Sequence, residues 1–365
     1  MDVIVNASGA LQDAPGTRLA LVQHQAISAC VHAAERNGVT RFVQISAAGA
    51  SVKASTAFLR TKAQADAALR ASTLAWTIFR PGLVIGNNAY GGTALLRMLA
   101  GLPGVQLLAL ADARVQTLAM QDLVQAVLMA ATNQIQGGRE YDLVESESHT
   151  LSEIVTRLRA HLGFGPPVAE LRLPLWVGRL VARIADLAGW LGWRSPLRST
   201  ALATLGEGVR GDATAWEADS GMRLAPLQQT LARLPATAQE RTYARVLLAL
   251  PVLVVTLAVF WIGTGIIALL RIDEAAAYLD GIVTATTART LVSAGAGIDI
   301  AIGCALLVRP WARAAATASA ALAAVYLLLG SMLVPQLWLD PMGAYLKVLP
   351  CIVASLALAL LLEKR

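Results

Sequence analysis

Four apolar segments in the C-terminal third of the chain restrict the fold more than any other feature. They cover about 246–270, 290–308, 314–338 and 344–362. Each approaches the roughly 20 residues that an α-helix needs to cross a bilayer. A soluble core could bury one such helix, but not four in succession with so few polar faces. The mean hydropathy of +0.57 and the charged fraction of 15% agree with this interpretation. We therefore predict an all-α membrane domain over 241–365 with four transmembrane helices.

Charged residues at the ends of these segments predict their orientation. The basic residues cluster on one side of the bilayer: Arg241, Arg245, Arg309, Arg313, Lys364 and Arg365. Arg271 is an exception, because it lies in the first connecting loop. The acidic residues of the connecting loops fall on the other side: Asp273, Glu274, Asp280 and Asp340. Because basic flanks stay in the cytoplasm, we predict a multi-pass protein of the cell inner membrane. Both termini and the whole of 1–240 would then be cytoplasmic.

The formal net charge of +6 raises the question of a nucleic-acid partner. The arginines form no basic run, and no zinc-finger spacing or aromatic-rich RNA motif is present, so nucleic acid is not an expected partner. A preference for anionic lipid explains the charge, and the lipid bilayer is the expected partner. The three cysteines and four histidines show no paired or ligand-like spacing, so we predict no metal site.

One carboxylate lies inside the second apolar segment, in the stretch "GAGIDIAIG". This residue is Asp299, and placing its charged carboxylate within a bilayer costs a few kcal/mol of free energy unless it is paired, protonated or hydrated. One interpretation makes it the partner of a proton or of a quinone head group. The other makes it a structural hydrogen bond to a neighbouring helix, which Gly295, Gly297 and Gly303 would allow to come close. The sequence leaves both interpretations open.

The first 240 residues are globular in composition and alternate between strand and helix patterns. Strands are predicted at 2–7 ("DVIVNA"), 41–46 ("RFVQIS") and 76–79 ("WTIF"). Helices are predicted between them, at 17–37 and about 56–71. Strands that alternate with helices indicate a parallel sheet with crossover connections.

Three further patterns fall in the second half of this globular region. Asp122, before the helical "LVQAVLMAA", is predicted to be an N-cap. "TLSE" at 150–153 fits a capping box that opens a helix to about 161. The stretch 173–193 is amphipathic and rich in arginine and tryptophan. It is either a helix that rests on the membrane interface or the packed wall of a substrate lobe.

The ordered series "VIVNASG … RFVQISAAGA … AFLRTKAQAD … WTIFRPGLVIG … TLAMQDLVQAV" resembles the atypical and extended short-chain dehydrogenase/reductase family. The resemblance covers roughly residues 1–230 and is closest to the NmrA-like branch, which includes the nucleotide-binding accessory subunit of mitochondrial complex I. The four-segment C-terminal block is similar to DoxX-like membrane domains. These resemblances imply an NAD(P)-binding, Rossmann-like α/β domain over 1–240 and a DoxX-like domain over 241–365.

In that family a serine, a tyrosine and a lysine act together during hydride transfer. Ser46 and Lys62 match the serine and the lysine, and the resemblance implies that they are the catalytic residues. Phe58 stands where the tyrosine should be, and its ring has no hydroxyl to serve as general acid. Loss of a general acid typically costs about 10²–10⁴-fold in rate. The departure therefore puts catalysis in doubt more than cofactor binding.

The family also begins with a strand, a glycine-rich turn and a helix whose N-terminus receives the pyrophosphate. This sequence matches the family only from its fourth strand onward, so we predict a partial Rossmann-like parallel sheet that lacks the first βαβ units. The resemblance implies NAD or NADP as the cofactor, with Asn6 to Gly9 along one side of the groove and Pro81 to Val84 beside the nicotinamide. The full set implied is Asn6, Ala7, Ser8, Gly9, Ser46, Lys62, Pro81, Gly82, Leu83 and Val84.

The leading functional hypothesis is therefore a membrane-anchored NAD(P)-binding reductase-like protein, with a lineage in quinone-linked or respiratory redox chemistry. A quinone or another respiratory membrane protein is the partner that this lineage suggests. The first alternative is a non-catalytic nucleotide-binding scaffold or sensor, which Phe58 favours. The second is a fragment of a longer reductase whose start has been placed at an internal methionine, which the missing glycine-rich turn favours.

Overall fold

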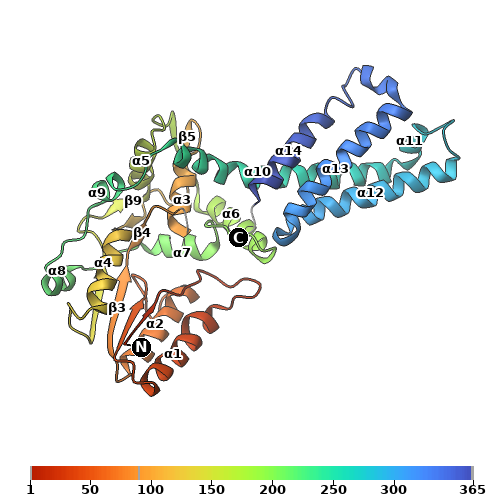
Figure 1. Ribbon diagram of the computed structural model, residues 1–365. Helices are drawn as coiled ribbons and strands as arrows, with labels where there is room; N and C mark the ends of the chain where they lie inside the picture. Colours follow the sequence, from red (N-terminus) through yellow and green to blue (C-terminus); the bar gives the residue numbers. More distant parts are fainter. Residues whose placement is uncertain (1, 89–90, 363–365) are drawn as a thin grey trace. The chain divides into compact units, whose positions relative to one another are not determined.

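The computed structural model describes residues 2–88 and 91–362. It divides into two compact units (Figure 1). Unit 1 comprises Met1–Trp190 and Arg194–Arg245, and unit 2 comprises Leu191–Trp193 and Val246–Arg365. The basic residues predicted at the C-terminus, Lys364 and Arg365, lie outside the described part of the chain.

The centre of unit 1 is a parallel four-stranded sheet in the order β1–β2–β3–β8. Its strands are β1 (Val3–Asn6), β2 (Arg41–Ile45), β3 (Ala75–Pro81) and β8 (Arg139–Leu143). Asn6 pairs with Gln44, and Ile45 pairs with Phe79, so the carboxyl ends of the first three strands lie level with one another. The predicted Rossmann-like parallel sheet is confirmed.

The two faces of this sheet follow from the alternation of side chains along each strand. Phe42 and Ile78 point to one face, where they pack with α1 (Ala26–Arg36) and α2 (Ala57–Arg70). Val43 and Phe79, one residue further along, point to the other face and pack with α4 (Met120–Ala131) and α8 (Thr214–Ser220). Both faces are covered, as a parallel sheet of apolar strands requires.

The helix predicted over 17–37 begins as a π-helical turn, η1 (Ala20–Gln25), and continues as α1. It stops at Asn37-Gly38, where Gly38 takes a φ of +67° that suits glycine. The strand β1 is an edge strand among the described residues, because β2 is its one partner in the sheet.

The rest of unit 1 forms a smaller lobe of short strand pairs and helices. The pairs are β4 (Leu83–Ile85) with β7 (Thr117–Ala119), β5 (Val105–Leu108) with β10 (Ala169–Arg172), and β6 (Arg114–Val115) with β9 (His149–Thr150). The helices are α3 (Gly91–Ala100), α5 (Leu151–His161), α6 (Leu175–Trp190), α7 (Ser199–Glu207) and α9 (Leu227–Ala232). Leucines and valines of α3, α5 and α9 form one core cluster.

Two predicted helix starts have different outcomes. The capping box is confirmed, because Thr150 Oγ1 accepts from the Glu153 amide and the Glu153 carboxylate accepts from the Thr150 amide. The N-cap at Asp122 is wrong, since α4 begins at Met120 and Ala119 is its cap. Asp122 lies in the first turn instead and accepts from the Ala225 amide and from Arg233.

Unit 2 is helical and apolar. Its elements are α10 (Ala238–Leu270, whose first two turns belong to unit 1), α11 (Ile272–Ala277), α12 (Ala285–Leu307), α13 (Arg309–Leu333), the 3₁₀ turn η2 (Pro335–Leu339) and α14 (Val348–Leu361). Among the described residues, α10, α12 and α13 are long and apolar enough to span a bilayer. Apolar side chains of α10, α12, α13 and α14 form their shared core.

The fourth predicted span differs from the structure. Helix α14 has 14 residues instead of covering 344–362, so it is about 21 Å long at the helical rise of about 1.5 Å per residue. A bilayer core is about 30 Å thick, so α14 by itself is too short to cross one. The prediction extended the helix over "AYLK", whereas α14 begins after Lys347, its N-cap.

Candidate functional site

Lys62 lies on α2 and directs its amine to the carboxyl ends of two neighbouring strands. Its Nζ donates to the Ser8 carbonyl over 3.0 Å and to the Ile45 carbonyl over 2.8 Å. The side chain is 5% exposed. Burial lowers the pKa of the Lys62 amine to about 8, and the nearby Asp66 opposes this fall. Helical spacing places the two residues one turn apart on α2.

Ser46 follows β2 and is hydrogen-bonded to the same helix. Its Oγ donates to Asp66 Oδ2 over 2.6 Å, and both residues are buried. Burial raises the pKa of the Asp66 carboxyl, and the hydrogen bond from Ser46 opposes the rise. The other carboxyl oxygen, Oδ1, has no hydrogen-bond partner among the described residues. The Ser46 hydroxyl is therefore committed to a residue that sequence analysis did not single out.

The loop after β1 forms the surface nearest to the Lys62 amine. Asn6 Oδ1 accepts from the Ser8 amide and the Ser8 hydroxyl, over 3.0 and 2.6 Å, and this holds the loop in a local turn. Asn6 Nδ2 donates to Gln44 Oε1 over 2.6 Å. A Cβ added to Gly9 would lie 3.5 Å from Lys62 Nζ, so the backbone of this loop passes close to the amine.

The second predicted stretch, Pro81 to Val84, runs from the last residue of β3 into β4. The Pro81 carbonyl accepts from the Ala48 amide over 3.1 Å, so this stretch runs beside the loop that follows Ser46. A Cβ at Gly82 would lie 2.5 Å from the Gln116 carbonyl oxygen, which leaves room for glycine alone. Leu83 and Val84 are half-buried. The structure thus joins the Ser46 loop both to Lys62, through the Ile45 carbonyl, and to Pro81.

Phe58 lies on the first turn of α2, one helical turn before Lys62. Its ring is half-buried and carries no hydroxyl. Thr56, the N-cap of α2, accepts from the Leu59 amide over 3.4 Å. Among the described residues that surround Lys62, the observed acceptors are main-chain carbonyls. The arrangement can hold a hydroxylated ligand by hydrogen bonds, but it offers no phenol for proton transfer.

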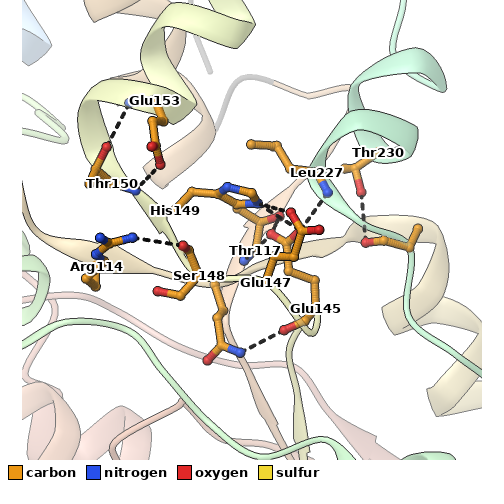
Figure 2. A network of polar contacts seen from close by, with 12 residues as sticks. Arg114, Thr117, Glu145, Glu147, Ser148, His149, Thr150, Glu153, Leu227 and Thr230 are labelled. Atoms are coloured by element: carbon orange, nitrogen blue, oxygen red, sulfur yellow. Dashed lines mark hydrogen bonds and ion pairs between the residues drawn. The ribbon is translucent and has the colours of Figure 1, made fainter.

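A second polar cluster is centred on Glu145, just after β8, and Figure 2 shows its contacts. The fully buried Glu145 carboxylate accepts from the Thr117 amide and hydroxyl, from the Leu227 amide, and lies 3.2 Å from His149 Nε2. These contacts join β7, β9 and the start of α9. Because the carboxylate is closed to solvent and surrounded by protein donors, the cluster stabilises the smaller lobe. Sequence analysis missed it, since "VESESH" reads as a charged loop.

In unit 2, Asp299 of α12 accepts a hydrogen bond from the Tyr326 hydroxyl of α13 over 3.0 Å. The glycines around it behave differently. A Cβ at Gly303 would lie 2.9 Å from the Ile262 amide nitrogen of α10, whereas one at Gly297 would meet nothing within 4 Å. Close helix approach is therefore a property of Gly303 and not of Gly297. No cluster of three potential metal ligands occurs within residues 2–88 and 91–362.

The comparisons with known proteins agree with these two units. A family model described as NAD(P)H-binding matches residues 1–103, and a DoxX-like family model matches residues 258–356. The N-terminal part of the chain is thus similar to NAD(P)H-binding domains, and the C-terminal part is similar to DoxX-like domains. A comparison with proteins of curated function finds no match.

Solved structures similar to this chain include three sugar-nucleotide or cofactor complexes. WbmH of Bordetella bronchiseptica, in complex with NAD+, is 18% identical with a TM-score of 0.46, over 67% of this chain and 75% of that one. RMD from Pseudomonas aeruginosa, with NADPH, is 13% identical with a TM-score of 0.46, over 67% and 82%. UDP-glucose 4-epimerase of Thermotoga maritima, with UDP-glucose, is 13% identical with a TM-score of 0.44, over 63% and 76%.

Proposed function

We propose that unit 1 binds the nicotinamide half of NAD or NADP at the carboxyl ends of β1 and β2, and that unit 2 anchors it in a membrane. The observation that carries the proposal is the buried Lys62 amine, which donates to two main-chain carbonyls beside the Asn6–Gly9 loop. An ammonium group has three N–H donors. Two are used here, and the third is available for a ribose hydroxyl.

The residues present fit one half of such a cofactor. Lys62, the loop at Gly9 and the Pro81–Val84 stretch would hold the ribose and the nicotinamide, which supplies or accepts a hydride when bound. For the pyrophosphate, the described residues form no glycine-rich turn before a helix N-terminus. The proposal is therefore limited to the nicotinamide side of the dinucleotide.

Nucleotide binding to the purified full chain in detergent tests this proposal. NADH and NADPH fluorescence would be titrated with the parent chain, with Lys62→Met and with Lys53→Met, an exposed lysine nine residues earlier. A hydrogen bond from a charged group contributes about 1.5–3 kcal/mol, so Lys62→Met should weaken binding about tenfold or more. Lys53→Met should leave it unchanged. Equal affinities for all three proteins, or no binding by the parent, would refute the proposal.

A more specific proposal concerns the reaction that the full chain carries out. We propose a role in redox chemistry with a quinone as the membrane-dissolved acceptor, and the Asp299–Tyr326 pair supports this as a hydrogen-bonding position within the helical unit. NAD(P)H oxidation by the full chain with a short-chain quinone tests it. Tyr326→Phe should lower the quinone-dependent rate without changing nucleotide affinity. A rate no greater than that of a protein-free control would remove the redox role.

The second candidate function is a non-catalytic nucleotide sensor or scaffold, and Phe58 is the observation that favours it. On this proposal the parent chain binds nucleotide but turns over no carbonyl, sugar-nucleotide or quinone substrate. Phe58→Tyr restores the phenol one helical turn before Lys62. Turnover by Phe58→Tyr but not by the parent would support the sensor, and robust turnover by the parent would exclude it.

We also propose that unit 2 is inserted in a cell inner membrane with residues 1–240 and the start of α13 on the cytoplasmic side. Arg309 and Arg313, at the start of α13, support this topology because basic residues favour the cytoplasmic face. Accessibility of single cysteines to an impermeant thiol reagent in intact cells tests it. A cysteine at Asp280 should react from outside, and a cysteine at Arg313 should react after lysis alone. The reverse pattern would invert the topology.

A further inference from the structure

Helix α6 (Leu175–Trp190) has its large apolar side chains outside and its small ones inside. Its packed face consists of small residues: Gly178, Ala182, Ala185 and Gly189. Its opposite face carries large apolar residues that are between 40% and 68% exposed: Leu175, Trp176, Leu180, Val181, Ile184, Leu187 and Trp190. A helix on the surface of a soluble domain has the reverse pattern. An unpartnered face of this size indicates a binding surface.

The packed face of α6 is fixed and cannot rotate to bury the large residues. A Cβ added to Gly178 would lie 2.7 Å from Ala109 Cβ, and one added to Gly189 would lie 2.8 Å from Arg198 Cζ. Asp186, the acidic residue of α6, accepts from Gln12 and from Arg198. These contacts hold the helix in unit 1 with its apolar face outward.

The charges of α6 indicate what covers this face. Arg179 and Arg183 are exposed, and Arg194 is exposed four residues after the helix ends. The Asp186 carboxylate is paired with Arg198 over 3.2 Å, so it does not offset the three exposed arginines. Tryptophan and arginine beside an apolar face are typical of helices that lie in the headgroup layer of an anionic bilayer.

Chain continuity joins α6 to the helical unit. Trp190 is followed directly by Leu191–Trp193, the segment that belongs to unit 2. The Leu191 carbonyl accepts from the Arg309 amide over 2.9 Å, and Trp193 Nε1 donates to the Leu307 carbonyl over 2.7 Å. The Arg309 guanidinium lies 5.5 Å from the centroid of the Trp193 ring. Leu191, the residue after α6, is thus hydrogen-bonded to the turn between α12 and α13. If these two helices span the bilayer, this turn lies at the membrane surface.

We propose that α6 is an interfacial helix whose exposed apolar face lies in the headgroup layer of an anionic lipid bilayer. The bilayer, and not a substrate or a second protein, is the occupant that its arginines, its tryptophans and its attachment at Leu191 all fit. The proposal depends on the membrane insertion of unit 2 but does not depend on nucleotide binding.

Fluorescence quenching of the full chain in vesicles tests the proposal. A single environment-sensitive label would be placed at Leu187→Cys, with Cys30, Cys304 and Cys351 replaced by alanine. The matched control is Val124→Cys on α4, which is likewise an exposed apolar residue of unit 1. A third label at Leu329→Cys on α13 reports insertion of unit 2. Quenchers would be a nitroxide lipid with its label near the headgroup and, in water, iodide.

In vesicles of phosphatidylcholine and phosphatidylglycerol, the lipid quencher should reduce emission at position 187 several-fold more than at 124. Iodide should do the opposite. Lipid quenching at 329 with none at 187 would overturn the proposal while leaving the anchor intact. No quenching at 187 or 329 would overturn both. Protection of 187 from both quenchers would overturn it as well, because a protein surface and not lipid would then cover α6.

The charges are tested with a double variant, Arg179→Glu with Arg183→Glu, carrying the label at 187. Lipid quenching should fall in vesicles that contain phosphatidylglycerol and should change little in phosphatidylcholine alone, because the arginines act on anionic headgroups. Equal quenching of the double variant and its parent in both vesicle types would overturn the assignment to an anionic surface.

Discussion

Ser46 Oγ lies 2.6 Å from Asp66 Oδ2, and both side chains are closed to solvent. The serine that was predicted to be catalytic is therefore hydrogen-bonded to a carboxyl on α2, one turn beyond Lys62. The pair joins the end of β2 to α2 at the point where the Lys62 amine enters the site.

Ser46→Ala should destabilise unit 1, and more so near neutral pH than near pH 4. Burial raises the pKa of the Asp66 carboxyl, and Ser46 opposes that rise. A carboxyl with a raised folded pKa contributes stability at low pH, and this is lost as pH rises through the folded pKa. Removing Ser46 raises that pKa further and leaves a buried acceptor unsatisfied, at a cost of about 1–3 kcal/mol.

The measurement is thermal unfolding of the full chain in detergent at the two pH values. Ser55→Ala, at an exposed position just before α2, is the control and should change little. A loss of stability that is the same at both pH values would show that Asp66 does not respond to Ser46.

Lys62→Met should remove a rise in stability that the parent shows above pH 8. Burial lowers the pKa of the Lys62 amine to about 8, below its ordinary value. Between about pH 8 and pH 10.5 the unfolded chain then binds more protons than the folded one, so stability rises with pH. The rise is at most about 3 kcal/mol. Unfolding temperatures across this range would measure it, with Lys53→Met as the control that keeps the rise.

Gly82→Ala should destabilise unit 1 by about 2–4 kcal/mol, because its Cβ would lie 2.5 Å from the main-chain oxygen of Gln116. The control is Gly165→Ala, where an added Cβ meets nothing within 4 Å. That change should be neutral or slightly stabilising. Denaturant unfolding of both variants checks the difference. Similar stabilities for the two would mean that the main chain at Gly82 and Gln116 can separate at little cost.

Glu145→Gln should cost about 2–4 kcal/mol, because an amide has one acceptor oxygen where the buried carboxylate uses two. Glu147, two residues later, lies 3.8 Å from His149 but is 66% exposed, so Glu147→Gln should cost little. Both substitutions replace one carboxylate with an amide, so the difference between their unfolding temperatures reports the effect of burial. An equal effect of both substitutions would contradict the structural role assigned to the Glu145 cluster.

Elements with regular local patterns could be predicted from the sequence. The β-branched strands "VIVN" and "RFVQI", the stop at Asn37-Gly38 and the capping box at Thr150 are determined by neighbouring residues, and all are present. The placement of Lys62 near the end of β2 was implied by the family resemblance and not by a local pattern, and in the structure its amine donates to the Ile45 carbonyl.

Features that depend on distant residues could not be predicted. Asp122 was expected to cap a helix, but its acceptors are used by Ala225 and Arg233, more than a hundred residues later. Asp66 is polar and lies on a helix of mixed composition, so nothing local indicates that Ser46 is its partner. The length of the fourth helix was overestimated because hydropathy reports how apolar a segment is and does not show where a helix begins.

The two carbonyls held by Lys62 also restrict how anything else can approach it. A lysine whose amine makes no hydrogen bonds can donate to a ligand from many directions. Here two of the three N–H groups already donate to the Ser8 and Ile45 carbonyls. The remaining proton points along one line set by main-chain atoms. The main chain at Ser8 and Ile45 would then determine which ligand hydroxyl the amine can reach. Substitution of neighbouring side chains would change the affinity for the ligand but not this stereochemical preference.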